Sequence, residues 1–408
     1  MPDKKKVLKK RLLKHLYFTK TLSCAELSWK INKSLPITTK LINELIEEGY
    51  IEDKGHAPST GGRRATTYSL RPDVLYIVSV AMDQFVTRIA LMDMHNQYVT
   101  EVKKVELPLT GNAQALNILV EHIEQFISHS AVPKEKIAGI GIGMPGFVDV
   151  RKGINYSFLQ TNGKSISEHI KDTIGLPVFI DNDSSLIALA ELRFGAARGR
   201  KNAMVVNIGW GVGLGLILNG ELFRGQNGFA GEFSHIPLFS NGKLCSCGKT
   251  GCLETETSLL VIIEKALEGL KAGRVSLLHS LPANKVEQAI EAIIEAAAKG
   301  DRFAVELFSE SGYNIGRGVA VLIHLLNPET IILSGRGSSA GKIWLAPIQQ
   351  ALNEHCIPRL ATNTSVELST INERAELIGS AALVMEHFVK ETDTIQAADL
   401  KPALSQNN

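Results

Sequence analysis

The 408-residue sequence has no run of eighteen or more uncharged hydrophobic residues, so we expect no membrane-spanning helix and no membrane partner. Its lysine-rich start, residues 1–14, lacks the hydrophobic centre and the small-residue cleavage site of a secretion signal. Together these absences predict a cytoplasmic protein. In that reducing compartment the five cysteines are expected to be metal ligands or free thiols, because disulfides are rare there.

Negative charge is scarce at the start of the chain. Residues 1–71 contain fifteen Lys and Arg against seven Asp and Glu, a net charge of +8, whereas the whole chain has a formal net charge of +2. The rest of the chain therefore has a net charge of −6. This asymmetry indicates that the basic head alone binds a polyanion. The alternative is a solvated, lysine-rich terminus.

The head contains three predicted helices in helix-turn-helix order. Hydrophobic residues recur at helical spacing over 7–16. Ser23 and Glu26 have the spacing of a capping box, which predicts a short helix over 25–31. A third helix begins near Pro36 and stops at Gly49, and in such motifs this helix lies in the major groove of DNA. It is predicted to bury Thr38, Leu41, Ile42 and Leu45 and to face DNA with Pro36, Thr39, Lys40 and Asn43.

A loop between two short predicted strands follows the third helix. The strands cover 50–52 and 66–70, and the glycine-containing loop between them includes Arg63 and Arg64. Arginines at a loop tip are suited to phosphates or to a minor groove. Residues 1–71 are therefore predicted to form a winged helix-turn-helix that binds DNA as a homodimer or higher homo-oligomer. The alternative is a helical dimerisation head with a disordered loop.

From about residue 72 the pattern changes to strands that alternate with helices, in an order that occurs twice. The first series has three strands, a helix and a buried strand, predicted over 76–81, 87–92, 98–107, 112–130 and 137–142. The second has strands over 203–208, 213–218, 221–224 and 330–333, with helices before the last. This duplication predicts an α/β, two-lobed actin-like or sugar-kinase-like body of the duplicated ribonuclease H type. The expected parts are a first lobe over 72–192 completed by a C-terminal helix near 374–390, a second lobe over 193–373, and a mobile tail over 391–408.

Four potential metal ligands lie close together in the second lobe. His235, Cys245, Cys247 and Cys252 have the spacing His-x9-Cys-x-Cys-x4-Cys, and this donor set suits tetrahedral Zn²⁺. A site filled by four protein ligands is structural, so we predict one structural zinc per chain. The alternative is a chance cluster of free thiols.

The residues around this cluster resemble the signature of a known family. The segments 231–235 (GEFSH) and 245–254 (CSCGKTGCLE) are similar to the signature of the ROK family (repressor, open reading frame, kinase), which joins bacterial sugar kinases and sugar-responsive repressors. The resemblance covers almost the whole chain. The head, with Gly62-Arg63 in its loop, resembles the regulator branch that includes repressors of N-acetylglucosamine, xylose and glucose genes. Ser234 departs from the pattern, because the family has glycine there.

A polar triplet, Asp181, Asn182 and Asp183, follows the predicted strand 178–180. From the residues alone, these side chains could hydrogen-bond sugar hydroxyls or cap the helix that follows. The resemblance implies the first, because the family's kinases hold the sugar with an Asn-Asp pair like Asn182-Asp183 and use the Asp as a general base. The resemblance also implies that zinc fixes the loop that presents further sugar ligands. The complete expected sugar-binding set is Gly146, Asn182, Asp183, Glu232, His235 and Glu254.

The phosphate-binding turns of the family's kinases are only partly present. Where those kinases have an Asp-x-Gly-Gly-Thr turn between the first two strands, this chain has residues 81–85 (AMDQF). The glycine-rich stretch 209–215 is retained, but it contains Trp210 and could equally be a tight β-turn. The Gly-Gly pair that those kinases have on the adenine side is replaced here by the sequence SGRG at 334–337. We therefore expect lost or vestigial ATP binding, with Asp183 as a sugar ligand and no longer a base.

These observations predict a sugar-responsive transcription regulator, in the repressor branch, that binds operator DNA and a sugar or sugar-phosphate effector. Two alternatives remain. One is a ROK-type ATP-dependent sugar kinase fused to a DNA-binding head. The other is a binding module controlled mainly by a protein partner, with a degenerate sugar site.

Overall fold

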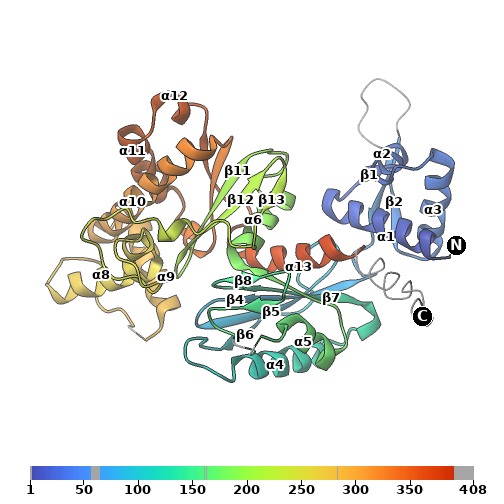
Figure 1. The fold of residues 1–408 in the computed structure, drawn as a ribbon, viewed down its shortest axis with the longest axis horizontal. Helices are drawn as coiled ribbons and strands as arrows, with labels where there is room; N and C mark the ends of the chain where they lie inside the picture. The colour runs from blue at the N-terminus through green and yellow to red at the C-terminus, as the bar shows by residue number, and fades with distance from the viewer. Residues whose placement is uncertain (1, 57–64, 160, 162, 283, 390–408) are drawn as a thin grey trace, which may run out of the picture.

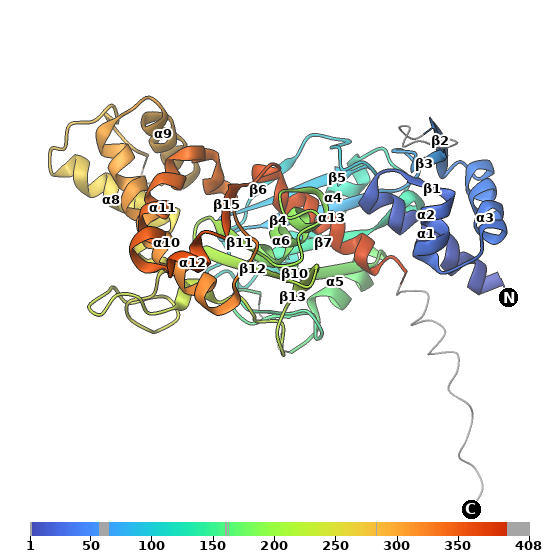
Figure 2. The same ribbon diagram turned by 90° about the horizontal axis from the view of Figure 1, so that it is seen from above.

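The computed structural model describes residues 2–56, 65–159, 161, 163–282 and 284–389. A small N-terminal head lies beside a two-lobed body (Figures 1 and 2). The predicted wing residues Arg63 and Arg64 and the predicted tail, 391–408, lie outside the described residues.

The head is a helix-turn-helix with a small sheet. The predicted capping box is confirmed, because Ser23 accepts a hydrogen bond from the Glu26 N–H and the Glu26 carboxylate binds back to Ser23. Gly49, at φ 77°, follows the end of the third helix. Trp29 is 80% exposed, so Ile31 fills the core position of the second helix. The elements are α1 (Pro2–Thr19), β1 (Leu22–Ser23), α2 (Cys24–Ile31), α3 (Leu35–Glu47), β2 (Ile51–His56) and β3 (Thr66–Leu70), with sheet order β1-β3-β2.

The α3 helix buries the face that its sequence predicts. The spacing of hydrophobic residues along 3.6 residues per turn places one stripe against the head core. The four predicted core residues are all buried, which confirms this prediction: Thr38, Leu41, Ile42 and Leu45.

The body contains two five-stranded sheets with equivalent topology. The first has the order β10-β7-β4-β5-β6 and the second β13-β12-β11-β14-β15. In each sheet the first strand pairs antiparallel with the second and parallel with the fourth, which confirms the predicted duplication. The first sheet comprises β4 (Tyr76–Met82), β5 (Val86–Met92), β6 (Lys103–Glu106), β7 (Ile137–Met144) and β10 (Val178–Asn182), and the second β11 (Ala203–Ile208), β12 (Val212–Leu218), β13 (Glu221–Phe223), β14 (Thr330–Ser334) and β15 (Ser365–Leu368).

The strand predicted over 98–107 is wrong in its first half. Strand β6 covers only Lys103–Glu106, because it pairs with the first four residues of β5. Tyr98 forms an isolated antiparallel bridge with Met92 at the far end of β5. Between these two points the chain leaves the edge of the sheet.

Helices cover the outer faces of both sheets, and two helices lie between them. The helix α6 packs on β12 and on α13, and α13 packs on β4 and β7. The C-terminal helix α13 therefore lies against the strands of the first sheet. The remaining elements are α4 (Ala115–His129), β8 (Val148–Asp149), β9 (Ile154–Asn155), α5 (Ile166–Ile174), α6 (Asp183–Phe194), α7 (Glu254–Thr257), α8 (Leu259–Lys271), α9 (Val286–Ala298), α10 (Arg302–Leu326), α11 (Leu345–His355), α12 (Pro358–Ala361) and α13 (Ala375–His387).

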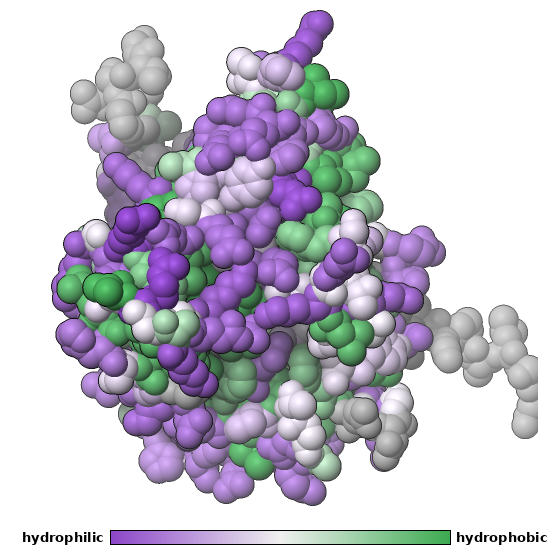
Figure 3. All heavy atoms as spheres, turned by 90° about the vertical axis from the view of Figure 1, so that its left-hand side faces the viewer, coloured by the Kyte–Doolittle hydropathy of each residue, from purple (hydrophilic) through white to green (hydrophobic). Residues whose placement is uncertain are grey.

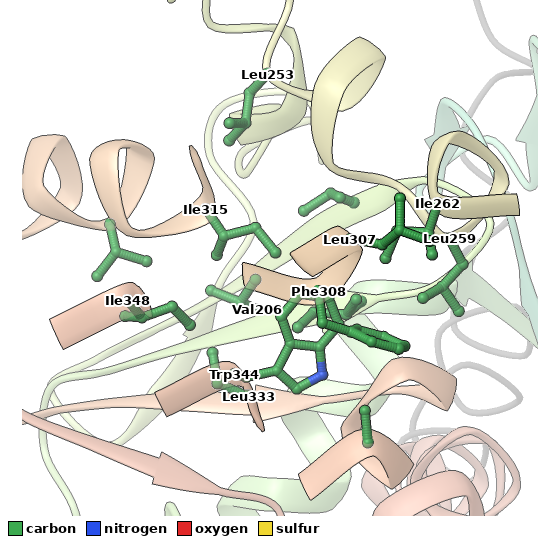
Figure 4. Close-up of a cluster of buried hydrophobic side chains, with 14 of the residues drawn as sticks. Val206, Leu253, Leu259, Ile262, Leu307, Phe308, Ile315, Leu333, Trp344 and Ile348 are labelled. Atoms are coloured by element: carbon green, nitrogen blue, oxygen red, sulfur yellow. The ribbon is translucent and has the colours of Figure 1, made fainter. Parts of the chain in front are cut away.

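The core of the second lobe is built around two aromatic side chains (Figure 4). The rings of Phe308 and Trp344 meet edge to face with centroids 5.1 Å apart. The Trp344 indole N–H donates to the Gly337 carbonyl at 2.8 Å, so its polar atom is satisfied although the side chain is fully buried. The core therefore fixes the 3-10 segment Arg336–Trp344 that borders the cleft between the lobes.

The surface agrees with the lack of long hydrophobic runs. The end of the second lobe seen in Figure 3 is mostly hydrophilic, with hydrophobic side chains scattered over it. Among the described helices, none has the length and hydrophobicity needed to cross a bilayer.

The head contacts the body through α1. The Lys14 ammonium lies 3.1 Å from the Glu386 carboxylate of α13. Arg193, in the last turn of α6, donates to the same carboxylate and lies over the Phe18 ring of the head at 4.9 Å. Both of the helices between the sheets therefore end at the head.

Candidate functional site

A cleft of about 430 Å³ lies between the two lobes. It is bordered by the ends of β7 and β10, the first turn of α6 and the turn between β11 and β12. The structure brings the entire predicted sugar-binding set to this cleft: Gly146, Asn182, Asp183, Glu232, His235 and Glu254.

Asn182 links the first turn of α6 to the chain segment that follows β7. Its side-chain oxygen accepts hydrogen bonds from the N–H groups of Ser184 at 3.0 Å and Ser185 at 3.2 Å, so it caps α6. Its amide nitrogen donates to the Gly146 carbonyl at 3.1 Å. Gly146 has φ 86°, and a Cβ there would lie 2.5 Å from Ser157. The capping interpretation therefore describes Asn182 correctly, and a second amide hydrogen can still serve a ligand.

Asp183 is a carboxyl group with an altered ionisation. Burial raises its pKa to about 7, and the nearby carboxylates of Glu376 and Asp83 add to the rise. Hydrogen bonds from Ser184 act in the opposite direction. At neutral pH, both ionisation states of Asp183 are therefore populated, so it can accept a hydrogen bond from a hydroxyl group or donate one.

Three further polar side chains come from the second lobe. Burial raises the pKa of Glu232, with Glu254 adding to the rise and His235 opposing it. His235 Nε2 lies 3.7 Å from the Glu232 carboxylate. The Glu254 carboxylate accepts a hydrogen bond from the Val212 N–H at 3.3 Å, and so it also closes the glycine-rich turn.

The four predicted metal ligands form one cluster. Their ligand atoms all lie within 4.8 Å of one another, with Cys247 Sγ and Cys252 Sγ 3.7 Å apart and Cys245 Sγ 3.5 Å from His235 Nδ1. A disulfide needs about 2.05 Å. Tetrahedral zinc predicts about 3.8 Å between sulfur atoms and about 3.5 Å from sulfur to nitrogen. The donor set and spacing therefore suit a four-coordinate ion, and His235 joins the cluster to the cleft.

The turn between β4 and β5 is closed by its own carboxylate. One oxygen of Asp83 accepts hydrogen bonds from the N–H groups of Phe85 and Val86, both at 2.8 Å. The other oxygen lies 3.0 Å from Arg88 and 3.3 Å from Arg336 of the second lobe. Two of the backbone donors that such a turn could offer to a phosphate, the N–H groups of Phe85 and Val86, are thus already paired.

An ion-pair network extends from this turn across the cleft. Arg88 also binds Glu376 of α13 at 2.8 Å, and Arg336 binds Glu287 of α9 at 2.9 Å. The Arg336 guanidinium lies over the Trp210 ring at 4.9 Å. The sequence pattern does not predict this network, because its partners are separated by up to 288 residues.

A second cross-lobe ion pair lies next to the polar triplet. The Asp181 carboxylate accepts two hydrogen bonds from Arg224, at 2.7 and 2.9 Å, and is almost fully buried. Asp181 therefore ties the end of β13 to the end of β10. Sequence analysis found Asp181 and missed its partner.

The predicted DNA-facing residues of α3 share one solvent face. Within the described part of the head, all four are exposed: Pro36, Thr39, Lys40 and Asn43.

A protein-family model described as the ROK family matches residues 78–387. The chain belongs to the ROK family. The resemblance inferred from the signature segments is therefore confirmed, and with it the predicted α/β fold. This ROK protein is 29% identical over 391 residues to the xylose repressor of Caldicellulosiruptor bescii, a match that covers 94% of this chain and 97% of the relative.

Two further comparisons concern a regulator and a kinase. A solved ROK family transcriptional regulator, a homologue of the Escherichia coli MLC protein, has a TM-score of 0.76 and 27% identity, covering 97% of this chain and 100% of its own. The glucokinase of Halalkalibacterium halodurans is 33% identical over 291 residues, covering 70% of this chain and 88% of the relative. The two matches to regulators must include most of the 71-residue head, because each leaves 6% or less of this chain unmatched.

The altered pKa of Asp183 predicts how the stability of this ROK protein depends on pH. The folded-state pKa, about 7, exceeds the ordinary value of 3.8, so the proton stabilises the folded state fully below about pH 4. This contribution is lost as the pH rises through 7. Asp183→Asn removes the titrating group, so urea unfolding should show the variant gaining stability relative to wild type between pH 5.5 and 8.5.

The matched control is Asp172→Asn, because Asp172 is exposed on α5. Its stability should stay parallel to wild type over the same range. Parallel curves for Asp183→Asn as well would contradict the assigned ionisation.

Proposed function

We propose that this ROK protein is a transcription regulator whose head binds operator DNA and whose cleft binds a sugar or sugar phosphate without phosphorylating it. The observation on which the proposal rests is the closure of the β4–β5 turn by Asp83, beside a cleft that gathers the expected sugar ligands. The regulator relatives, which match the head as well as the body, support it.

The cleft has the chemistry of a hydroxyl-binding site. Carboxylates, an amide and an imidazole from both lobes converge on it, and such groups satisfy the donors and acceptors of a sugar ring. Asp183 and Glu232 have raised pKa values because of burial. A ligand that donates hydrogen bonds to their ionised forms would replace the lost hydration and lower these pKa values.

The nucleotide side of the cleft is unfavourable for phosphate transfer. Kinases stabilise the transferred phosphoryl group with free backbone donors and positive charge. Here Asp83 pairs with two donors of the first turn, and Glu254 with a donor of the second. Both guanidinium groups of the network, Arg88 and Arg336, are already paired with carboxylates, so neither is free to neutralise a polyphosphate.

The two central helices connect the cleft to the head. The α6 helix begins at Asp183 in the cleft and has Arg193 in its last turn. Arg193 shares Glu386 with Lys14 of α1. A ligand that shifts the lobes around α6 would therefore change the position of the head on the body. In a dimer it would also change the spacing of the two α3 helices.

We further propose that His235, Cys245, Cys247 and Cys252 hold a structural zinc ion. When bound, zinc would neutralise the thiolates and cross-link the loop. Through His235 Nδ1 it would fix the ring, so that Nε2 faces Glu232 and the cleft.

The first prediction concerns DNA. Lys40→Ala should weaken binding to all DNA sequences alike and reduce the salt slope by about one, because it removes one phosphate contact. Thr39→Ala and Asn43→Ala should instead change the preferred bases. Fluorescence anisotropy over a salt series measures both effects.

Lys171→Ala, an exposed lysine on α5 of the body, is the control and should bind like wild type. If a chain lacking residues 1–71 bound the operator with full affinity, the head would not be the DNA-binding part. Sedimentation of the full chain should show at least a dimer, and a strict monomer with and without DNA would contradict the homodimer.

The second prediction separates sensing from catalysis. Asp183→Ala should lower the affinity for the sugar at least about tenfold, through the loss of a charged hydrogen bond. It should leave DNA binding intact but abolish the sugar-induced change. A thermal-shift screen identifies the sugar first, and calorimetry and anisotropy then follow the variant, with the exposed Asp172→Ala as control.

A coupled assay with Mg²⁺ and ATP tests the fused-kinase alternative, which the glucokinase relative makes worth measuring. Wild type should show no turnover with the same sugar. Turnover on the order of 1–100 per second, abolished by Asp183→Ala, would favour the kinase.

The third prediction concerns metal. Protein purified without chelator should contain about one zinc per chain, and Cys247→Ser should lose most of it together with sugar affinity. Cys24→Ser, outside the cluster, is the matched control and should keep the zinc. Elemental analysis checks this. Full zinc content in Cys247→Ser would contradict the site, and zinc loss with unchanged sugar affinity would break its link to the cleft.

A further inference from the structure

Three aromatic side chains contact one another beside the cleft, and the proposed sugar contacts do not use them. Phe147 and Tyr156 belong to the first lobe, and Phe229 belongs to the second. The Phe229 ring meets the Phe147 ring edge to face at 5.8 Å and the Tyr156 ring at 6.2 Å. Phe147 is 39% exposed and Tyr156 49% exposed, and Phe147 and Phe229 line the cleft. We call these three residues the aromatic rim.

The first-lobe part of the rim is held in place by buried hydrogen bonds. The Asn155 side chain, 1% exposed, donates to the Pro145 carbonyl and accepts from the N–H groups of Ser157 and Phe158. The Phe147 N–H donates to the Ser157 hydroxyl at 2.9 Å. Gly146 directly precedes Phe147 in the chain, and its carbonyl accepts a hydrogen bond from the Asn182 side chain. The rim is therefore adjacent to two of the proposed sugar ligands.

The second-lobe part of the rim is also held in place, by close backbone packing and by a hydrogen bond. Gly231 has φ 102°, and a Cβ there would lie 2.2 Å from the Leu214 carbonyl oxygen, so the chain passes close to β12. The Ala230 N–H donates to the Arg224 carbonyl at 3.1 Å, and Arg224 is paired with Asp181. Phe229 is thereby set opposite Phe147, with two residues between it and Glu232. Such preorganisation lowers the cost of ordering a binding site.

We propose that the aromatic rim is a second saccharide subsite, and that the effector is a disaccharide or longer saccharide whose second ring packs against Phe147 and Phe229. This inference rests on the proposed binding of sugar in the cleft. The C–H groups on one face of a pyranose ring have a partial positive charge, and the face of an aromatic ring is negative. A sugar ring therefore suits an exposed aromatic face next to polar groups.

A protein partner fits the rim less well. A specific protein interface covers roughly 800 Å² per partner. The exposed parts of Phe147 and Tyr156, at 39% and 49% of each side chain, amount to about 200 Å² for aromatic residues of ordinary size. The rim is also continuous with the polar cleft, which favours a ligand that is polar at one end.

The test compares monosaccharides with matched disaccharides on the full-length protein: xylose with xylobiose, glucose with cellobiose and maltose, and N-acetylglucosamine with its β-1,4 disaccharide. Calorimetry should show at least tenfold tighter binding of one disaccharide than of its monosaccharide. Phe147→Ala and Phe229→Ala should each remove this gain and leave the monosaccharide affinity within about twofold. Phe229→Tyr, which keeps an aromatic ring, should retain most of it.

Phe223→Ala is the matched control, because Phe223 is 46% exposed in the same lobe and outside the cleft lining; it should change neither affinity. Melting temperatures of all variants should stay near wild type. If every disaccharide binds no tighter than its monosaccharide, or if the rim variants weaken both ligands equally, the second subsite is wrong while sugar sensing stands. If neither class of ligand binds, and a thermal-shift screen of sugars and sugar phosphates finds no other ligand, the proposed function itself fails, and the subsite with it.

Discussion

The body depends on how closely α6 is packed between the two sheets. Three positions that pack against it are glycines. On β12, a Cβ at Gly213 would lie 2.0 Å from Ser184 of α6, and a Cβ at Gly215 would lie 2.2 Å from Ala188 of α6. On the other side, a Cβ at Gly379 of α13 would lie 2.1 Å from the Leu186 carbonyl. Native packing leaves no space to absorb such contacts. The position of α6 therefore sets the distance between the lobes, and Asp183, its first residue, is placed in the cleft as a consequence.

This packing also explains why the glycine-rich hairpin is retained beside a closed phosphate turn. Gly213 and Gly215 are needed for α6, and the backbone of the hairpin turn accommodates Glu254, whose oxygen would lie 2.5 Å from a Cβ at Gly211. None of these three roles involves a nucleotide. Across the cleft, Asp83 and Arg336 form an ion pair between the lobes. The lobes are thus held together by the chain's own charges at the turn between β4 and β5.

The features that could be predicted from the sequence are those that depend on residues close together in the chain. The buried face of α3 follows from helical periodicity, and the cluster around Cys245 and Cys247 follows from local spacing. The strand near Tyr98 was wrong, because pairing with β5 stops where the chain bends away from the sheet edge. Contacts between distant segments could not be predicted, since nothing in the pattern pairs Asp181 with Arg224. The aromatic rim was missed for the same reason.

The α6 helix is a structural link between the cleft and the head. The α6 helix has 12 residues, which is about 18 Å of rigid helix, and it has a proposed ligand contact at one end and a head contact at the other. Its last turn and the end of α13 meet at one carboxylate, Glu386, which also binds Lys14 of the head. Two rigid helices that converge on one charged junction transmit a change of lobe angle with little loss, because a packed core moves between discrete arrangements and does not deform smoothly. Coupling between two binding sites is reciprocal. If sugar changes the affinity for operator DNA by some factor, operator DNA must therefore change the affinity for sugar by the same factor. Under the proposed function, the ion pairs of Glu386 with Arg193 and Lys14 are the contacts through which this coupling would reach the head.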